Sequence, residues 1–402
     1  MENFVFAHLA DVHLGAFREP ELRELNARAF EAVLDACSEA DFLVIAGDLF
    51  DTPLPDLSIV DRAVKKMRAL VEQGKKIYLV YGSHDYSVNE TSVIDVLNSA
   101  GVITKITGGK AENNRIKLDF TKDEATGALL TGLSARKRGL ELENYEALDL
   151  NHLQERNGFK VFAFHSGIEE HKPDFLKGVE SIPLSLLPKG FDYYAGGHVH
   201  KRIDIVEKNY GRIVYPGPLF AADYKDLDDL AEKEHGFYMV RVKGGEVIAE
   251  FKPIKVAEVV KIGADANEKS ASALRDELLS TARETKAIGK IILLRVAGEL
   301  ASGNPGEVGF NEVRSAFEGA LVVKVNRSKL TAPKLERIKV EGEDKRAVEK
   351  ALFKSLANGK WSHEPAAPLL EALKQPRSNE ETKTNYEERV KQRAFSLLEG
   401  LK

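Results

Sequence analysis

Aspartate and histidine residues recur at five places in the chain, each directly after a short apolar run. These places are Asp11-Val12-His13, Gly47-Asp48-Leu49-Phe50-Asp51, Gly82-Ser83-His84-Asp85, His165-Ser166-Gly167 and Gly197-His198-Val199-His200. The apolar runs are predicted to be strands, and in open α/β sheets the carboxyl ends of the strands face the binding crevice. We therefore expect five strand ends to bring these side chains to one edge of the fold.

The spacing within the motifs is that of a shared ion site. In Asp11-Val12-His13 and His198-Val199-His200, residues two apart on an extended backbone point the same way, so both side chains of a pair can reach one ion. Glycines before Asp48, Ser83 and His198 and after His165 let the chain turn sharply without a Cβ in the way. A lone histidine is usually an ordinary structural side chain, but five of the ten histidines end strands in this way.

Mixed imidazole and carboxylate ligands are typical of Mn²⁺, Fe²⁺ or Zn²⁺, whereas Mg²⁺ and Ca²⁺ prefer oxygen ligands alone. The six or seven candidate ligands in these motifs are too many for one ion. Two ions about 3.5–4 Å apart would use them, generate a hydroxide nucleophile and stabilise both oxygens of a phosphoryl displacement. The predicted reaction is therefore phosphoester hydrolysis. The chain has neither a Walker loop nor a Gly-x-Ser-x-Gly motif, so no motif supports an NTPase or a serine hydrolase.

The elements that must position these residues alternate between short apolar runs and amphipathic segments, which predicts an α/β fold. The strands are predicted at 3–10, 42–47, 76–82, 128–133, 160–165 and 191–196. Apolar residues three and four apart predict helices at 22–37 and 57–73. After residue 200, turns that contain glycine separate strand-like stretches and predict hairpins; the stretches are 203–208, 212–216, 236–243 and 247–252.

Three regions are predicted along the chain, and the first closes near residue 253. Residues 254–330 repeat the alternation on a smaller scale and predict an α+β domain, with strands at 258–263, 290–298 and 320–326 and helices at 269–284 and 310–318. Residues 331–402 hold 15 Lys and Arg against 12 Asp and Glu, with amphipathic helical patterns at 348–356 and 386–401. These helices have no sheet to cover, so they indicate a docking module or, alternatively, an extension folded against the chain's own body.

Length and composition limit the class of protein. The 402 residues correspond to two or three domains of about 150 residues each. The single cysteine, Cys37, cannot form an intramolecular disulfide or a thiolate cluster, which excludes zinc fingers and iron–sulfur centres. Without a basic N-terminal region or an apolar run near ~18 residues, the chain is expected to be cytoplasmic with no membrane association. The net charge of −5 excludes a chain-wide basic excess but leaves local basic patches open.

As an ordered set, the motifs resemble the calcineurin-like metallophosphoesterase superfamily over residues 1–253. Within it, the stretches 11–15, 47–51, 193–200 and 215–217 look like the SbcD/MRE-eleven nucleases of double-strand-break repair. The resemblance implies a two-sheet metallophosphoesterase sandwich flanked by helices, a small α+β capping domain that contacts DNA and a helical C-terminal tail that binds an ATPase partner. It also leads us to expect an archaeal source.

The resemblance also implies which residues bind metal, which one is catalytic and which orient the others. It implies a centre of two Mn²⁺ ions, with Asp11, His13 and His200 on one ion, His165 and His198 on the second, and Asp48 bridging both. His84 matches the catalytic histidine of the family, which binds no metal and stabilises the transition state or protonates the leaving oxygen. Asp51 and Asp85 match positions that orient the ligands or His84.

Two residues depart from the family pattern. Ser83 stands where the family has an asparagine that completes the second metal site. A serine hydroxyl is shorter, so the second site is expected to be weaker or more selective for its metal. Pro218 follows Tyr-Pro-Gly where the family often has a serine.

The leading hypothesis is a Mn²⁺-dependent DNA exonuclease and endonuclease that acts with an SMC-like ATPase and associates with the nucleoid when engaged on DNA. The family's homodimerisation leads us to expect an interface at helices near 57–73 and 88–100. Basic residues are candidates for contacts with the DNA backbone, although scattered surface charge explains any one of them as well. They are Arg136, Lys137, Arg138, Lys201, Arg202, Arg327 and Lys329.

Two other functions remain open from the residues. One is a phosphodiesterase or phosphatase on small nucleotides, although a capping domain and a tail of over 70 residues exceed what that task needs. The other is a scaffolding subunit in which Ser83 leaves little catalysis. The presence of His84 and the other ligand types argues against such a decayed site.

Overall fold

The chain divides into two compact units, Met1–Ala332 and Pro333–Lys402. The computed structural model describes residues 3–86, 91–135, 141–154, 157–172, 181–333, 368–369, 371–378 and 381–399. Among these residues, no helix is both long enough and apolar enough to span a bilayer.

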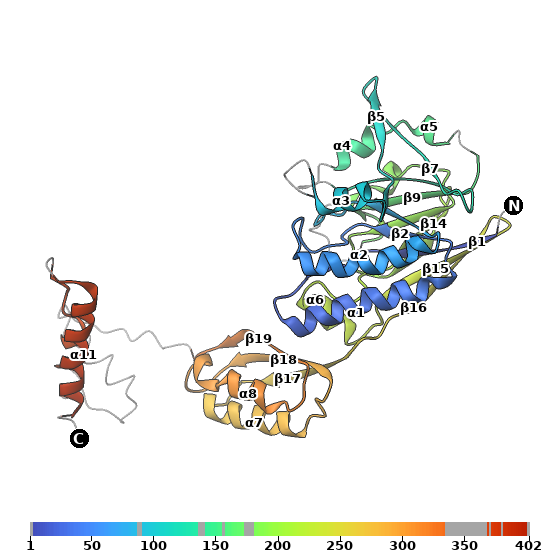
Figure 1. The fold of residues 1–402 in the computed structure, drawn as a ribbon. Coiled ribbons are helices and arrows are strands. Elements are labelled where there is room, and N and C mark those ends of the chain that lie inside the picture. The colour runs from blue at the N-terminus through green and yellow to red at the C-terminus, as the bar shows by residue number, and fades with distance from the viewer. Residues whose placement is uncertain are drawn as a thin grey trace. The chain divides into compact units, whose positions relative to one another are not determined.

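Two six-stranded sheets form the centre of the first unit (Figure 1). In spatial order, the first sheet contains β16 (Glu246–Pro253), β15 (Gly236–Lys243), β1 (Phe4–Leu9), β2 (Phe42–Ala46), β3 (Lys76–Val80) and β4 (Thr104–Lys105). The second contains β13 (Ile203–Val206), β14 (Arg212–Tyr215), β12 (Tyr193–Gly197), β9 (Lys160–His165), β8 (Leu129–Leu133) and β7 (Thr121–Lys122). Parallel pairing joins β1 to β2 and β2 to β3, and it joins β8 to β9 and β9 to β12. Within each sheet, the carboxyl ends of these strands therefore meet at one edge.

The space between the two sheets is filled by large side chains from alternate strand positions. Phe6 and Phe42 stack with ring centroids 5.0 Å apart, and Tyr193 of the second sheet meets the Phe6 ring edge-on at 5.1 Å. All three are fully buried. Burial on both faces explains why these strands are continuous apolar runs in the sequence, and the predicted two-sheet sandwich is confirmed.

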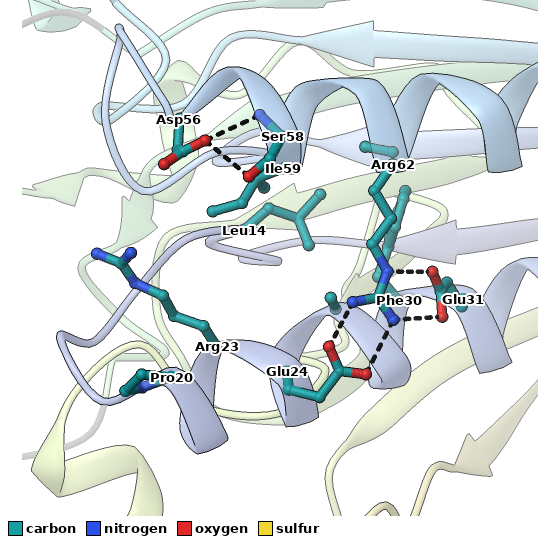
Figure 2. A pocket seen from close by; sticks show the side chains of 12 residues that line it. Leu14, Pro20, Arg23, Glu24, Phe30, Glu31, Asp56, Ser58, Ile59 and Arg62 are labelled. Atoms are coloured by element: carbon teal, nitrogen blue, oxygen red, sulfur yellow. Dashed lines mark hydrogen bonds and ion pairs between the residues drawn. The ribbon is translucent and has the colours of Figure 1, made fainter.

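Helices α1 (Pro20–Ala36) and α2 (Leu57–Glu72) cover the outer face of the first sheet. Between them lies a cavity of about 350 Å³ with an apolar floor that includes Leu14, Phe30 and Ile59 (Figure 2). On its rim, Arg62 of α2 donates hydrogen bonds to both Glu24 and Glu31 of α1. The cavity contains none of the candidate metal ligands, and the ion pairs on its rim join the two helices.

A three-stranded parallel sheet follows, with the order β17 (Glu258–Asp265), β18 (Lys290–Glu299) and β19 (Val322–Thr331). Helices α7 (Ala271–Glu284) and α8 (Phe310–Ala316) pack on one face of this small sheet. On its other face, Ile291 and Leu293 join the apolar cluster that contains Phe237 of the first sheet. The alternation of strands and helices predicted over 254–330 is confirmed, although β19 continues five residues past its predicted end at 326. The boundary near 253 stays a prediction.

In the second unit, helix α11 (Lys383–Glu399) corresponds to the predicted helix at 386–401. Its Arg389 donates hydrogen bonds to Glu381 and Gln375. The other predicted helix of this region, at 348–356, lies outside the described residues.

Several elements of the first unit carry no prediction. They are β5 (Gly109–Glu112), β6 (Arg115–Leu118), α4 (Glu141–Glu146), α5 (Leu150–Gln154), β10 (Gly167–Ile168), β11 (Ser181–Ile182) and α6 (Tyr224–Leu230). Helix α3 (Val93–Ser99), in contrast, lies within the helix expected near 88–100. The β5–β6 hairpin turns at Asn113 and Asn114, which both have positive φ, as a two-residue turn between antiparallel strands requires. Its strands are largely exposed and polar, so no apolar period marks them.

Candidate metal centre

The five motifs lie at the carboxyl ends of β1, β2 and β3 in the first sheet and of β9 and β12 in the second. Backbone hydrogen bonds tie the first two loops together, since Asp11 N donates to Gly47 O (3.2 Å) and His13 N donates to Asp48 O (2.9 Å). The second sheet joins them through His165, whose Nδ1 donates to Ala46 O at 2.8 Å. The loops that follow the carboxyl ends of the strands therefore lie side by side, although they come from two different sheets.

Three overlapping groups of side chains place their ligand atoms within 4.8 Å of one another. The groups are Asp11, His13 and His200; His13, Asp48 and His84; and Asp11, Asp48 and His165. Within these groups, Asp11, His13, Asp48 and His165 are buried, whereas His84 is exposed. Because Asp11, His13 and Asp48 each belong to two groups, the cluster is continuous.

Five of the candidate ligands have a backbone conformation that side chains other than glycine rarely adopt. They are Asp11 (φ 50°), His13 (φ 47°), Asp48 (φ 52°), His198 (φ 94°) and His200 (φ 52°). Such conformations cost about 1–3 kcal/mol each and persist only where the surrounding structure enforces them, most often at functional sites. The fold therefore maintains strain at the residues that the sequence predicts as ligands.

Neighbouring glycines make the close approach of these loops possible. A Cβ on Gly47 would lie 2.3 Å from His165 Nδ1, and one on Gly82 would lie 2.0 Å from Asp48 Oδ1. A Cβ on Gly197 would lie 2.0 Å from Ala46 O. The interpretation that these glycines remove a steric obstacle at the site is confirmed at all three positions.

His13 and His200 each use the Nδ1 atom of the ring in a hydrogen bond, so the Nε2 atom of each ring is available to bind a cation. Asp51 Oδ1 accepts from His13 Nδ1 (3.3 Å), and Asp226 Oδ2 accepts from His200 Nδ1 (2.9 Å). The Nε2 atoms of His13 and His200 then lie 3.1 Å apart. Two nitrogens that each bind one ion at about 2.0–2.1 Å are about 3 Å apart when they are neighbouring ligands. The spacing of this pair therefore fits a common cation.

Burial and charge at the cluster favour a cation. Among the described residues, the buried Asp11 Oδ2 has no hydrogen-bond partner. Burial opposes a charge on His165, but the carboxylates of Asp48, 3.1 Å from Nε2, and Asp11 raise the pKa of His165 to about 10. Burial likewise opposes a charge on Asp48, but His165 and His13 hold the pKa of Asp48 below its ordinary value. These Asp and His groups are thus arranged to hold divalent metal ions.

His84 is held differently from the buried histidines. Its Nδ1 donates to Asp51 O at 2.7 Å, so Nε2 takes no part in this bond, and 47% of the side chain is exposed. Its backbone N donates to Asp48 Oδ1 at 2.8 Å. The imidazole is therefore fixed beside the cluster while one side stays open to solvent.

Ser83 and Asp85 flank His84 on the same loop. The hydroxyl of Ser83 lies 3.5 Å from Asp48 Oδ2, at the limit of a hydrogen bond. The carboxylate of Asp85 accepts from the backbone N–H groups of Leu49, Phe50 and Gly82. Asp85 thus joins the β2 and β3 loops through their backbones, and burial followed by the charge of Asp48 raises the pKa of Asp85.

His198 lies beside the three groups without belonging to them. Its backbone N donates to Asp11 Oδ1 at 2.8 Å, and its ring centroid is 5.2 Å from that of His165. Burial and the neighbouring His165 lower the pKa of His198 to about 4, so the ring is neutral at pH 7. A neutral imidazole is the form that binds metal.

The residues predicted to contact DNA have varied surroundings. Lys201 forms an ion pair with Asp229 at 2.6 Å, and Arg202 lies over the ring of Phe251 at 4.3 Å. Arg327 lies over the ring of Phe310 at 5.3 Å, and Lys329, also on β19, is exposed. The remaining three, Arg136, Lys137 and Arg138, lie outside the described residues.

The two-sheet sandwich thus carries, at its strand ends, a cluster of Asp and His side chains that could hold divalent metal ions. Residues 4–202 match the model of the calcineurin-like phosphoesterases, so this part of the chain is a calcineurin-like phosphoesterase domain.

Similar proteins come from archaea and from a bacterium. The "DNA double-strand break repair protein Mre11" of Methanopyrus kandleri is 31% identical over 285 residues, which cover 67% of this chain and 61% of the relative. The protein of the same name from Archaeoglobus fulgidus is 28% identical over 59% of this chain and 57% of its own length. The "uncharacterized metallophosphoesterase YhaO" of Bacillus subtilis is 26% identical over 74% of this chain and 72% of its own length. The chain thus spans about three fifths of the two archaeal relatives.

Proposed function

We propose that this chain is a Mn²⁺-dependent nuclease that hydrolyses phosphodiester bonds of DNA at double-strand breaks, as an exonuclease and an endonuclease. The observation that carries the proposal is the set of three overlapping Asp and His groups that share Asp11, His13 and Asp48. Support for DNA as the substrate comes from the archaeal relatives, whose names describe double-strand break repair.

In this proposal the cluster holds two Mn²⁺ ions. One set of ligands is Asp11, His13 and His200, the other is His165, His198 and Ser83, and Asp48 belongs to both. Bound ions of this kind lower the pKa of a water molecule and stabilise charge on the attacking and leaving oxygens. His84 acts on the substrate through Nε2, because its Nδ1 donates to Asp51 O. The imidazolium form carries a second N–H on Nε2, which it donates to the leaving oxygen, and the neutral ring that remains keeps its Nδ1 proton.

The proposal extends to domains and partners. Residues 1–253 form the nuclease domain, 254–330 a capping domain that contacts DNA, and 331–402 the region that binds an SMC-like ATPase. A second copy of the chain binds at α2 and α3, where the side chains of Leu57 and Val96 are 79% and 57% exposed. The complex acts in the cytoplasm, at the nucleoid.

The first test measures nucleotide release from end-labelled linear duplex DNA in Mn²⁺, Mg²⁺ or EDTA. We expect release in Mn²⁺ and none in EDTA, because in this proposal the attacking hydroxide forms from water only when the ions are bound. A parallel reaction on cyclic nucleotides under the same metal tests the small-nucleotide alternative. Hydrolysis of cyclic nucleotides without any release from DNA would overturn the proposal.

Ser83 provides a separate prediction about the second ion. Its hydroxyl is short and 3.5 Å from Asp48 Oδ2, whereas an asparagine oxygen at this position reaches further into the cluster. We expect Ser83→Asn to tighten the weaker of two Mn²⁺ binding steps by about tenfold, close to 1.4 kcal/mol. Isothermal titration of metal-free protein measures both steps. An unchanged titration would show that Ser83 does not limit the second site, and nuclease activity in Ser83→Asn but not in the wild type would favour the scaffolding alternative.

A further inference from the structure

Helix α6 (Tyr224–Leu230) carries an aspartate that contacts a candidate metal ligand from behind. Asp226 Oδ2 accepts from His200 Nδ1 at 2.9 Å, and the same oxygen accepts from Ala222 N at 2.9 Å. The side chain of Asp226 is only 8% exposed. The imidazole of His200 is therefore held between the carboxylate of Asp226 on one side and the other candidate metal ligands on the other.

The local sequence fixes Asp226 in this position. Asp223 caps the helix and accepts from the backbone N of Lys225 (2.7 Å) and of Asp226 (3.0 Å). One turn later, Asp229 forms an ion pair with Lys201, the residue that follows His200, at 2.6 Å. Helix α6 thus binds the His200 segment at two adjacent residues, which leaves the carboxylate little freedom to move.

We infer that Asp226 is a positioning residue for His200: it fixes the rotation of the imidazole and keeps the proton on Nδ1, so that Nε2 is directed at the cluster. A carboxylate accepts hydrogen bonds only, so the proton of a neutral His200 resides on Nδ1. The unprotonated Nε2 is then the atom that lies 3.1 Å from His13 Nε2. The inference rests on the proposed function, in which His200 binds a metal ion.

The neighbouring Asp228 offers a matched control on the same helix. Its Oδ1 contacts Arg295 at 3.1 Å and Lys261 at 3.3 Å, both on the three-stranded sheet. A substitution at Asp228 therefore removes a carboxylate and its contacts from the same helix while leaving His200 untouched.

The test is isothermal titration of Mn²⁺ into the metal-free full chain. Loss of a carboxylate that supports a ligating histidine lowers metal affinity by about 10–100-fold. We expect this loss in one of two binding steps for Asp226→Ala and a smaller loss for Asp226→Asn, because a single amide oxygen can still accept both hydrogen bonds. Asp228→Ala is expected to bind Mn²⁺ as the wild type does. Rescue by asparagine separates positioning from a general loss of structure.

Circular dichroism and thermal unfolding of the metal-free proteins establish which variants fold. If Asp226→Ala does not fold, Asp226→Leu, which is close to aspartate in size but has no acceptor, carries the test. A folded Asp226→Ala, or failing that Asp226→Leu, with both Mn²⁺ steps unchanged would overturn the inference and leave the proposed function standing. A wild-type chain that binds no Mn²⁺ would overturn the proposed function itself and, with it, the role of Asp226.

Discussion

Replacing Asp48 with asparagine is expected to lower the rate of nucleotide release from duplex DNA by about 10³-fold or more. Asp48 belongs to two of the three groups, and its Oδ2 lies 3.1 Å from His165 Nε2 and 3.5 Å from His13 Nε2. Loss of this shared charge removes several kcal/mol of metal-dependent transition-state stabilisation, and about 4 kcal/mol corresponds to the stated factor. Initial rates at saturating DNA measure the effect, and Mn²⁺ titration should show weakening of both binding steps.

The substitution is chosen to preserve the fold. Asparagine retains an oxygen in place of Oδ1, which accepts from His84 N at 2.8 Å. Asp61→Asn is the matched control, because Asp61 is 60% exposed and pairs with Lys65 on the same helix. Retention of more than a tenth of the wild-type rate by a folded Asp48→Asn protein would contradict the role of Asp48 as a shared ligand.

The strands that carry the site were predictable from the sequence because both of their faces are buried. Strands β1, β2 and β9 are almost continuous apolar runs, and a polar residue that ends such a run stands out. The carboxyl ends of parallel strands lie at one edge of a sheet. A short motif after each strand was therefore sufficient to predict that side chains far apart in the sequence lie close together.

The contribution of Asp226 could not be predicted in the same way. It lies 26 residues after His200 in a short helix, and its three neighbouring aspartates look alike in the sequence. Only the packing of α6 determines that Asp226 contacts His200 while Asp228 contacts the small sheet. A carboxylate whose role is to orient another side chain has no spacing rule of its own.

The positive φ angles at the ligands were likewise invisible in the sequence. Aspartate and histidine tolerate the left-handed region better than most residues, but nothing in a single sequence marks where they adopt it. The glycines at 47, 82 and 197 were informative because each removes a Cβ from a contact that the folded loops require. For Lys201, the charge could be read from the sequence but its surroundings could not. This basic residue, a candidate for contact with DNA, forms an ion pair with Asp229.

The second large effect is expected at His84. Replacement by serine should lower kcat by about 10²–10⁴-fold, the contribution typical of a general acid or base. Both Mn²⁺ binding steps should remain close to those of the wild type, because the ring is 47% exposed and is held by Asp51 O rather than by a buried acceptor. Single-turnover rates and Mn²⁺ titration of the same preparation measure the two quantities independently. His152→Ser, at a half-buried histidine that donates to Leu118 O, is the matched control.

The pair of measurements distinguishes two roles that the geometry of His84 allows. Its ligand atom lies within 4.8 Å of those of His13 and Asp48, so a purely spatial criterion would count it as a metal ligand. A ligand would lose Mn²⁺ affinity and kcat together on substitution, whereas a residue that acts on the substrate loses kcat alone. A fall in Mn²⁺ affinity of about tenfold or more in His84→Ser would therefore assign His84 to the metal shell. Unchanged affinity with a large loss of kcat would assign it to the substrate, beside an intact centre of Asp11, His13, Asp48 and His165.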